Sequence, residues 1–260
     1  KVKADVLSGL EPLLDRGIVL PQVSFLVSDW LVNNIKIIET LMSHDWSHAN
    51  LIVRSSAHGE DSVNGSMAGH YCTVMNVKGS VELKSAVNEV IASYDQPNLQ
   101  DKVLIQPQLD KVRVSGVVFT YDPTTSGSYY VINLIEGLDT TAITSGNSND
   151  GNTWYVHRTL EACSDPTIQR IVNLCREVEK IVSDDCIDIE FAEDLDGNLY
   201  LLQVRPLNIR KSESLMQIEI EDALKDAAKL LKRISQPHPY LKGQRSILGV
   251  MPDWNPAEVI

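Results

Sequence analysis

Residues 187–206 read IDIEFAEDLDGNLYLLQVRP, and this stretch is the most informative part of the chain about its fold. Two apolar runs flank the segment DLDGN at 194–198, whose Asp, Gly and Asn residues favour a tight turn. The stretch therefore predicts a β-hairpin with strands over 187–192 and 199–204.

Four polar side chains on this hairpin suggest chemistry. Alternation along a strand places Asp188 and Glu190 on one face of the first strand, and Gln203 and Arg205 on one face of the second. Carboxylate and amide oxygens suit Mg²⁺, and a guanidinium suits phosphate. The pattern fits Mg²⁺ bridging phosphates, and the alternative is the solvent-facing side of an edge hairpin.

A second candidate segment is VRSSA at 53–57, which leads into a polar loop rich in small residues at 57–69. Such a loop can bring backbone N–H groups close to phosphate oxygens, and Arg54 would add a planar charged fork. The alternative is an ordinary strand followed by a flexible loop.

A third candidate is VLIQPQL at 103–109, an apolar strand that runs into a polar segment. Pro107 lacks an N–H for the ladder, so we expect the strand to end there. Its free carbonyl and the N–H of Leu109 could pair with an adenine edge. The alternative is simply the end of a strand.

Helices are expected between these segments. An amphipathic pattern predicts a helix over 3–16, which Pro12 threatens to break. Ser28 is expected to cap a second helix with Leu31, Ile35, Ile38 and Leu41 on its apolar face, and Ser80 a third. Asp165-Pro166 predicts the start of a further helix.

The character of the chain changes after Pro206. A single charged amphipathic helix is expected over 218–234, followed by Pro237 and Pro239. We therefore expect a nucleotide-binding domain over 1–208, and a helical linker with the start of another domain over 209–260.

Bulk composition narrows the function classes. The 260 residues carry a formal net charge of −12, which makes nucleic acid a poor partner. The four cysteines form no C-x-x-C pair, so reduced thiols in the cytoplasm are expected. No apolar run is long enough for a membrane span, and no signal peptide is recognisable.

Other catalytic patterns are missing from the sequence. It contains no G-x-x-x-x-G-K-[ST] loop and no G-x-S-x-G elbow. HDWSH at 44–48 has Asp where a zinc helix would have its Glu, so we interpret it as a surface segment.

Taken together and in order, these segments resemble the motifs of the phosphoenolpyruvate synthase and pyruvate phosphate dikinase family. The matching stretches are Lys3-Ala4, RSSA at 54–57 with Glu60-Asp61 and SMAG at 66–69, SGVVFTYDP at 115–123, DIE at 188–190 and QVRP at 203–206. The resemblance covers roughly residues 3–207. It implies an α/β fold of the ATP-grasp type, with two subdomains of mixed or antiparallel sheets and flanking helices.

The resemblance also implies roles for individual residues. Lys3, Arg54 and Arg205 would act on the phosphates of ATP, and Asp188 would lie beside them. Glu190 and Gln203 would bind Mg²⁺. A phosphate loop and an adenine hinge would complete the site, and their residues are Ser66, Ala68 and Gly69 for the loop and Gln106, Pro107, Gln108 and Leu109 for the hinge.

Members of the family use ATP to phosphorylate a histidine on a separate swivelling domain, which passes the phosphoryl group to a small molecule. The resemblance thus implies an ATP-dependent phosphotransferase that needs histidine and substrate domains outside these residues. The final acceptor stays open between pyruvate, glutamine and rifamycin antibiotics; MPDWNPAE at 251–258 is a slight pointer to glutamine kinases. Two alternatives are a degenerate ATP-grasp binding module and a carboxylate–amine ligase.

Overall fold

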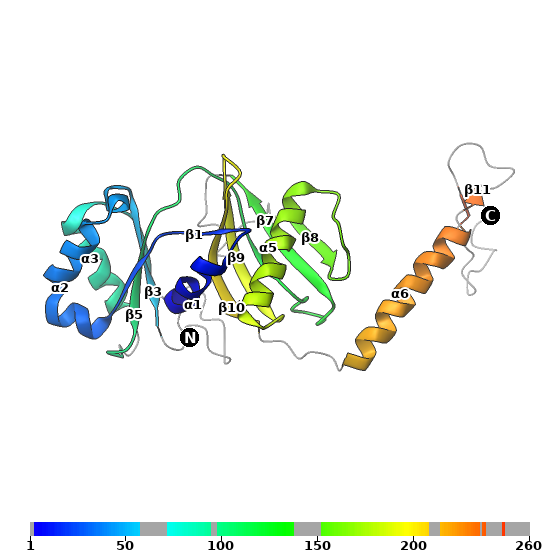
Figure 1. The fold of residues 1–260 in the computed structure, drawn as a ribbon, viewed down its shortest axis with the longest axis horizontal. Coiled ribbons are helices and arrows are strands. Elements are labelled where there is room, and N and C mark those ends of the chain that lie inside the picture. The colour runs from blue at the N-terminus through cyan, green and yellow to red at the C-terminus, as the bar shows by residue number, and fades with distance from the viewer. Residues whose placement is uncertain are drawn as a thin grey trace, which may run out of the picture. The chain divides into compact units, whose positions relative to one another are not determined.

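A computed structural model describes residues 3–57, 72–94, 98–137, 152–207, 214–234, 236–237 and 246–247. The chain divides into two compact units, Lys1–Ile209 and Arg210–Ile260. The first unit is of the mixed α/β class with two sheets and flanking helices, which confirms the expected fold class (Figure 1).

The larger sheet of the first unit has six strands in the order β1-β10-β9-β6-β7-β8. All neighbouring pairs are antiparallel except β1 with β10, which is parallel. The predicted hairpin of β9 and β10 therefore lies inside the sheet. The strands are β1 (Ile18–Val19), β6 (Val112–Phe119), β7 (Tyr129–Glu136), β8 (Asn152–His157), β9 (Ile187–Asp194) and β10 (Leu199–Pro206).

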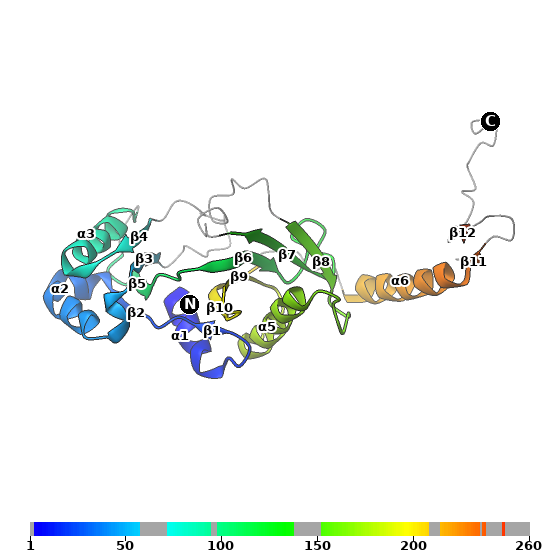
Figure 2. The same ribbon diagram turned by 90° about the horizontal axis from the view of Figure 1, so that it is seen from above.

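Helices α1 (Lys3–Leu10) and α5 (Pro166–Val182) cover one face of this sheet (Figure 2). The buried face of α5 carries Ile168, Ile171 and Val178, which join Ile189 and Phe191 of β9 in one core. Asp165 caps α5 by accepting bonds from the backbone N–H groups of the first turn, and Pro follows at the first helical position. The sequence prediction for this helix is confirmed.

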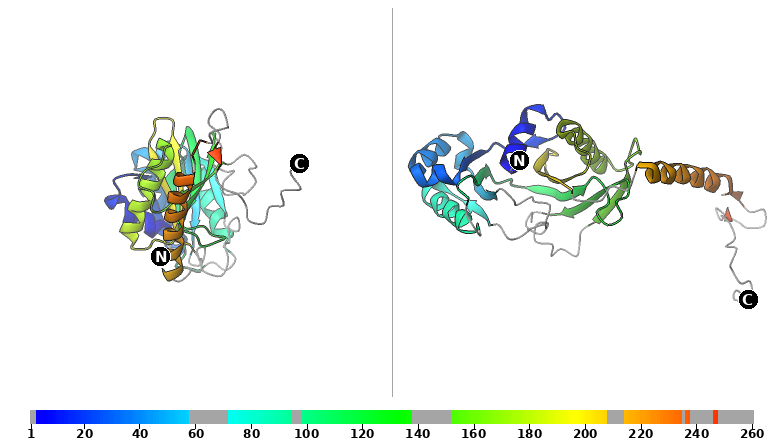
Figure 3. Two further views of the ribbon diagram at one scale, coloured as in Figure 1. Left: turned by 90° about the vertical axis from the view of Figure 1, so that its right-hand side faces the viewer. Right: turned by 90° about the horizontal axis from the view of Figure 1, so that it is seen from below.

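The smaller sheet has four antiparallel strands in the order β2-β5-β3-β4. Helices α2 (Val27–Met42) and α3 (Gly79–Ala92) pack on one face of it around a second core (Figure 3). The opposite face carries the side chains of Arg54 and Gln106. The strands are β2 (Val23–Leu26), β3 (Leu51–Ser56), β4 (Thr73–Val77) and β5 (Lys102–Pro107).

Three local expectations about the helices were wrong. The first helix ends at Leu10, and a 3₁₀ turn follows over Glu11–Leu13, because Pro12 cannot continue the ladder. Helices α2 and α3 begin at Val27 and Gly79, so their N-cap residues are Leu26 and Lys78 and not Ser28 and Ser80.

The predicted apolar face of α2 was also wrong in part. Leu31 and Ile35 are 64% and 65% exposed, and the helix instead buries Val27, Trp30 and Leu41. Asn33 has non-helical dihedral angles and interrupts the helix, so the two halves present different faces. A regular 3.6-residue period therefore does not describe α2.

The second unit contains helix α6 (Ser214–Ile234) and a two-stranded ladder of β11 (Gln236–Pro237) and β12 (Ser246–Ile247). The described side chains of α6 include the exposed Leu224 and Leu230. In the part of the chain that the structure describes, no helix is both long enough and apolar enough to cross a membrane.

Candidate nucleotide site

The β9–β10 hairpin brings Asp188 and Glu190 opposite Arg205 and Gln203. The register is Glu190 with Gln203 and Asp188 with Arg205, and it follows a β-bulge between Leu201 and Gln203. The bulge adds one residue to β10, which turns Gln203 and Arg205 onto the face that carries the two carboxylates.

Arg205 binds Asp188 through two parallel hydrogen bonds. Nε lies 3.0 Å from Oδ1 and Nη2 lies 2.8 Å from Oδ2. Arg205 Nη2 is also 3.8 Å from Oε1 of Glu190. A bidentate pair of this kind fixes the plane of the guanidinium, so Arg205 is held in one orientation.

Arg54 reaches the same cluster from the other sheet. Its Nη2 lies 3.6 Å from Oε2 of Glu190 and 3.5 Å from Oε1 of Gln203. Both contacts are long, at the limit of a hydrogen bond or ion pair. The structure thus brings together residues that are 149 positions apart in the chain.

The cluster is withdrawn from solvent. Asp188 is 7% exposed and Gln203 is 2% exposed, while the side chains of Arg54 and Glu190 are 13% and 14% exposed. The interpretation of this hairpin face as a solvent-facing edge is therefore wrong. Burying charged groups is costly unless they are paired, and each carboxylate here faces an arginine.

Lys3 lies near the same sheet end as Arg54. It is buried at the first position of α1, and the next residue, Ala4, donates its backbone N–H to Oγ of Ser56 at 3.1 Å. Ser56 follows Arg54 by two positions on β3, so the two side chains leave the strand on the same face.

The predicted hinge leads from the small sheet toward the large one. Gln106 is buried and donates from Nε2 to Oε1 of Gln22 at 3.4 Å. The strand ends at Pro107, as predicted. Gln108 and Leu109 follow it and are half-buried. The predicted loop residues Ser66, Ala68 and Gly69 lie outside the described residues.

Sequence reasoning from single residues did not find the buried hydroxyl of Ser115 on β6. This side chain is 1% exposed, and its Oγ makes no hydrogen bond within the described residues. Ser115 is paired with Ala192, two positions from Glu190 on β9, so all three share one face of the sheet. The signal in the sequence was the Ser-Gly pair that opens one of the quoted motifs.

The second residue of the Ser-Gly pair, Gly116, is required by close packing between strands. A Cβ at this position would lie 2.2 Å from the backbone oxygen of Asn133 and 2.9 Å from the ring of Phe191. Only glycine leaves room for this close approach between strands. The Ser-Gly pair thus combines a packing requirement on one face with an unbonded hydroxyl on the other.

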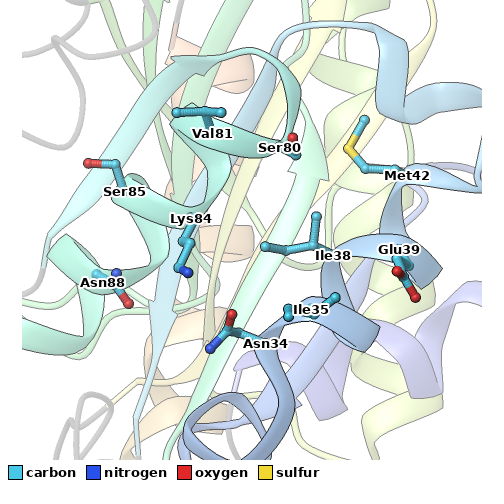
Figure 4. Close-up of a pocket in the computed structure, with 10 residues that line it drawn as sticks. All are labelled: Asn34, Ile35, Ile38, Glu39, Met42, Ser80, Val81, Lys84, Ser85 and Asn88. Carbon is cyan, nitrogen blue, oxygen red and sulfur yellow. The ribbon is translucent and has the colours of Figure 1, made fainter.

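A groove elsewhere on the small subdomain is separate from this cluster. It has a volume of about 720 Å³ and lies between α2 and α3, with Ile35, Ile38, Val81 and Lys84 among its lining residues (Figure 4). These helices cover the face of the small sheet opposite to Arg54. We assign no ligand to this groove.

Comparison with known proteins identifies the family of the chain. The family model of the "Pyruvate phosphate dikinase, AMP/ATP-binding domain" matches residues 23–165, more than half of the 260 residues. The chain therefore belongs to this family of ATP-binding domains. The matched range includes Arg54 and the hinge, whereas Lys3 and the β9–β10 hairpin lie outside it.

One curated relative is the phosphoenolpyruvate synthase of Escherichia coli (strain K12). It is 25% identical over 222 residues, which cover 80% of this chain and 27% of that protein. The chain thus spans about a quarter of the length of this relative.

Solved structures of D-alanine–D-alanine ligases are similar at a lower level. The enzyme from Coxiella burnetii gives a TM-score of 0.46 at 15% identity, covering 85% of this chain and 51% of the other. The enzyme from Bacillus anthracis gives 0.44 at 14% identity, covering 85% and 62%. Likenesses at this level carry no conclusion about this chain.

Proposed function

We propose that this chain is the MgATP-binding part of a phosphotransferase of the phosphoenolpyruvate synthase type. The observation that carries the proposal is the meeting of Arg54 from one sheet with Glu190 and Gln203 from the other. A cationic group and two oxygen donors from separate sheets would enclose a polyphosphate between them.

The contacts of the Arg54 guanidinium are long, which suits a side chain that leaves its present partners to bind a ligand. At 3.5 and 3.6 Å they gain little, so a phosphate oxygen at ordinary hydrogen-bond distance would compete well for the guanidinium. Arg205 differs, because Asp188 already fixes its orientation. In the proposal Arg54 moves onto the phosphates of ATP, while Arg205 offers a pre-oriented donor. Lys3, beside the end of β3, supplies a third positive charge.

The donor set fits Mg²⁺. Glu190 and Gln203 face each other with a carboxylate and an amide oxygen, which are the hard ligands that this ion prefers, and phosphate oxygens and water complete its shell. Within the described residues no cluster of three or more His, Cys, Asp and Glu side chains could hold a metal alone. The ion would therefore bind together with the nucleotide, and it would reduce the negative charge of the polyphosphate.

The base would lie against the hinge. The adenine edge presents one donor and one acceptor, which match the carbonyl of Pro107 and the N–H of Leu109. Gln106 lines the start of this segment, and the orphan hydroxyl of Ser115 offers a further donor on the sheet face near Glu190.

A titration of the protein with ATP tests the assignment. We expect binding that requires Mg²⁺, and we expect Arg54→Ala to raise the dissociation constant roughly tenfold to a hundredfold, since a charged hydrogen bond is worth about 1.5–3 kcal/mol. Glu190→Gln is expected to remove most of the dependence on Mg²⁺.

Arg16→Ala is the matched control, because it removes one exposed arginine and changes the net charge equally. Arg16 precedes β1, which pairs with Tyr200 and Leu201 of β10 and not with Gln203 or Arg205. Calorimetry with and without Mg²⁺ gives the dissociation constants of ATP for the parent and the three variants. If Arg54→Ala and Glu190→Gln both bind like the parent, the site is misassigned.

The proposed reaction is transfer of a phosphoryl group from ATP to a histidine on a separate domain, which then passes it to a small molecule. Support for it is the family membership and the relation to phosphoenolpyruvate synthase. Pyruvate is the first acceptor to test in the full-length protein, and glutamine and rifamycin follow. Formation of an acid-labile, base-stable phosphoprotein would support the histidine step, and its absence with bound MgATP would argue against it.

A second candidate is a degenerate module that binds no nucleotide. The retained set of Lys3, Arg54, Glu190, Gln203 and Arg205 argues against it, because loss of function removes the pressure to keep such a set. A titration without any heat of binding would favour this candidate.

A further inference from the structure

The hinge is tied to a distant strand of the small sheet by a pair of amide side chains. The backbone N–H of Asn76 donates to Oε1 of Gln108 at 2.8 Å, and Nε2 of Gln108 donates to Oδ1 of Asn76 at 3.1 Å. Asn76 belongs to β4, while Gln108 comes directly after β5. The strand order β5-β3-β4 places β3 between them, so this pair reaches across a whole strand.

The backbone of Asn76 is shaped for this contact. Its φ is +58°, in the left-handed region that Asn tolerates better than most residues. The register of β3 with β4 shifts here, from Leu51 opposite Val77 to Val53 opposite Val74, so Asn76 lies in a β-bulge. A bulge residue is left out of the regular ladder, and its N–H is free to turn toward Gln108.

The second attachment of Gln108 is through its backbone. Its N–H donates to the carbonyl of Asn50 at 2.7 Å, one residue beyond the pair of Leu51 with Pro107. By the alternation of antiparallel ladders, the carbonyl of Pro107 then points away from β3. In an extended chain the N–H of Leu109 points to the same side as that carbonyl.

The side chain and the backbone of Gln108 are thus both held from the β3–β4 side. These attachments fix the carbonyl of Pro107 and the N–H of Leu109 in an orientation away from β3. These are the two groups that the proposed function assigns to the edge of the base.

We infer that the Asn76–Gln108 pair is a positioning clamp, which orients the hinge carbonyl and N–H and so selects adenine over guanine. The inference rests on the proposed nucleotide site. Adenine presents a 6-amino donor and an N1 acceptor, whereas guanine presents an O6 acceptor and an N1–H donor. A hinge peptide that is held in place mismatches guanine at both positions, while a released peptide can rotate to reduce the mismatch.

The experiment compares nucleotide binding by the full chain and three variants. Asn76→Gly keeps the left-handed backbone and removes the side-chain half of the clamp, and Gln108→Ala removes both hydrogen bonds. The control is Ser183→Gly, which makes the same kind of change at another left-handed position, the end of α5. Dissociation constants for MgATP and MgGTP are measured by calorimetry, together with hydrogen exchange, without nucleotide, of the residue-108 amide, which is bonded to the carbonyl of Asn50.

For Gln108→Ala we expect about a fivefold to tenfold weaker affinity for ATP, an unchanged affinity for GTP, and faster exchange of the residue-108 amide, in keeping with the loss of one net hydrogen bond. Asn76→Gly is expected to give a smaller effect in the same direction, and Ser183→Gly none.

If ATP affinity and the ratio of ATP to GTP affinity match the parent in both clamp variants, the inference is overturned while the proposed function stands. Equal losses for ATP and GTP also overturn it, because they show a merely structural role. A parent that binds neither nucleotide overturns both proposals together.

Discussion

Strand β9 carries carboxylates withdrawn from solvent on both of its faces, and their distances to the neighbouring arginines differ between the two faces. On the helix side, Glu193 is 1% exposed and is bound by Arg113 of β6 and by Arg170 of α5, the latter at 2.5 Å. On the other side, Glu190 meets Arg54 and Arg205 at 3.6 and 3.8 Å. Short bonds to two arginines saturate Glu193, whereas Glu190 keeps loose partners that a ligand can replace.

The difference separates an ion pair that stabilises the fold from one that suits binding. Arg170 also donates to the carbonyl of Gly197 in the β9–β10 turn, and Arg113 also donates to Thr167 at the start of α5. The Glu193 cluster thus joins α5, β6 and the hairpin. The Glu190 cluster joins two sheets, and among the described residues α1 and α5 cover the other face of the large sheet.

The largest effect on stability is expected for Glu193→Gln. Removing this charge leaves two arginines without their carboxylate, and we expect a loss of about 2 kcal/mol in the free energy of unfolding, below the full value for a buried pair because both arginines are half exposed. Urea unfolding followed by circular dichroism measures it.

Glu190→Gln is the matched control on the opposite face, with an expected change within about 0.5 kcal/mol. Equal losses for the two variants would remove the distinction between the clusters.

A smaller effect is expected for Asp188→Asn. The substitution weakens the two charge-assisted bonds to Arg205 and leaves the side chain in place, so we expect a loss of about 1 kcal/mol of stability. The loosened Arg205 should also weaken ATP binding. An unchanged ATP affinity would show that the orientation of Arg205 does not matter for the nucleotide.

The smallest effect concerns the pH dependence of stability. Burial raises the pKa of Glu179 on α5 above its ordinary value, although Arg158 lies beside it. Because the pKa of Glu179 is higher in the folded protein, the folded protein binds this carboxyl proton more tightly than the unfolded chain does. Proton binding at Glu179 therefore adds to the free energy of unfolding. The addition is full below the unfolded pKa of about 4.3 and is lost as the pH rises through the folded pKa.

In Glu179→Gln, the free energy of unfolding should therefore change less with pH than in the parent, in the range just above the unfolded pKa of Glu179. Thermal melts across the acidic range, with the exposed Glu161→Gln as control, measure the difference. Parallel profiles for parent and Glu179→Gln would contradict the direction of the shift.

The clamp and the Glu190 cluster differ in how much of each could be predicted from the sequence. Strand alternation predicted that Asp188 shares a face with Glu190 and that Gln203 shares a face with Arg205, and the end of β5 followed from Pro107. The bonds of Gln108 to Asn76 had no signal in the sequence, because they depend on a bulge in a strand that is not adjacent to the hinge. The interrupted helix α2 was missed for a similar reason, since the dihedral angles of Asn33 break the period on which the prediction relied.

The sequence by itself determined the elements with strong local signals. The turn residues at 194–198 determined the hairpin, and Asp165-Pro166 determined the start of α5, because capping and turn formation involve only neighbouring residues. Tertiary structure alone decided which side chains meet. Counting from the turn would place Leu202 opposite Glu190, and only the bulge after Leu201 brings Gln203 there. Arg54 completes the cluster because the small sheet meets the larger subdomain, where Leu104 of β5 joins the core of the large sheet. Such a meeting depends on contacts between distant parts of the chain and not on any short stretch.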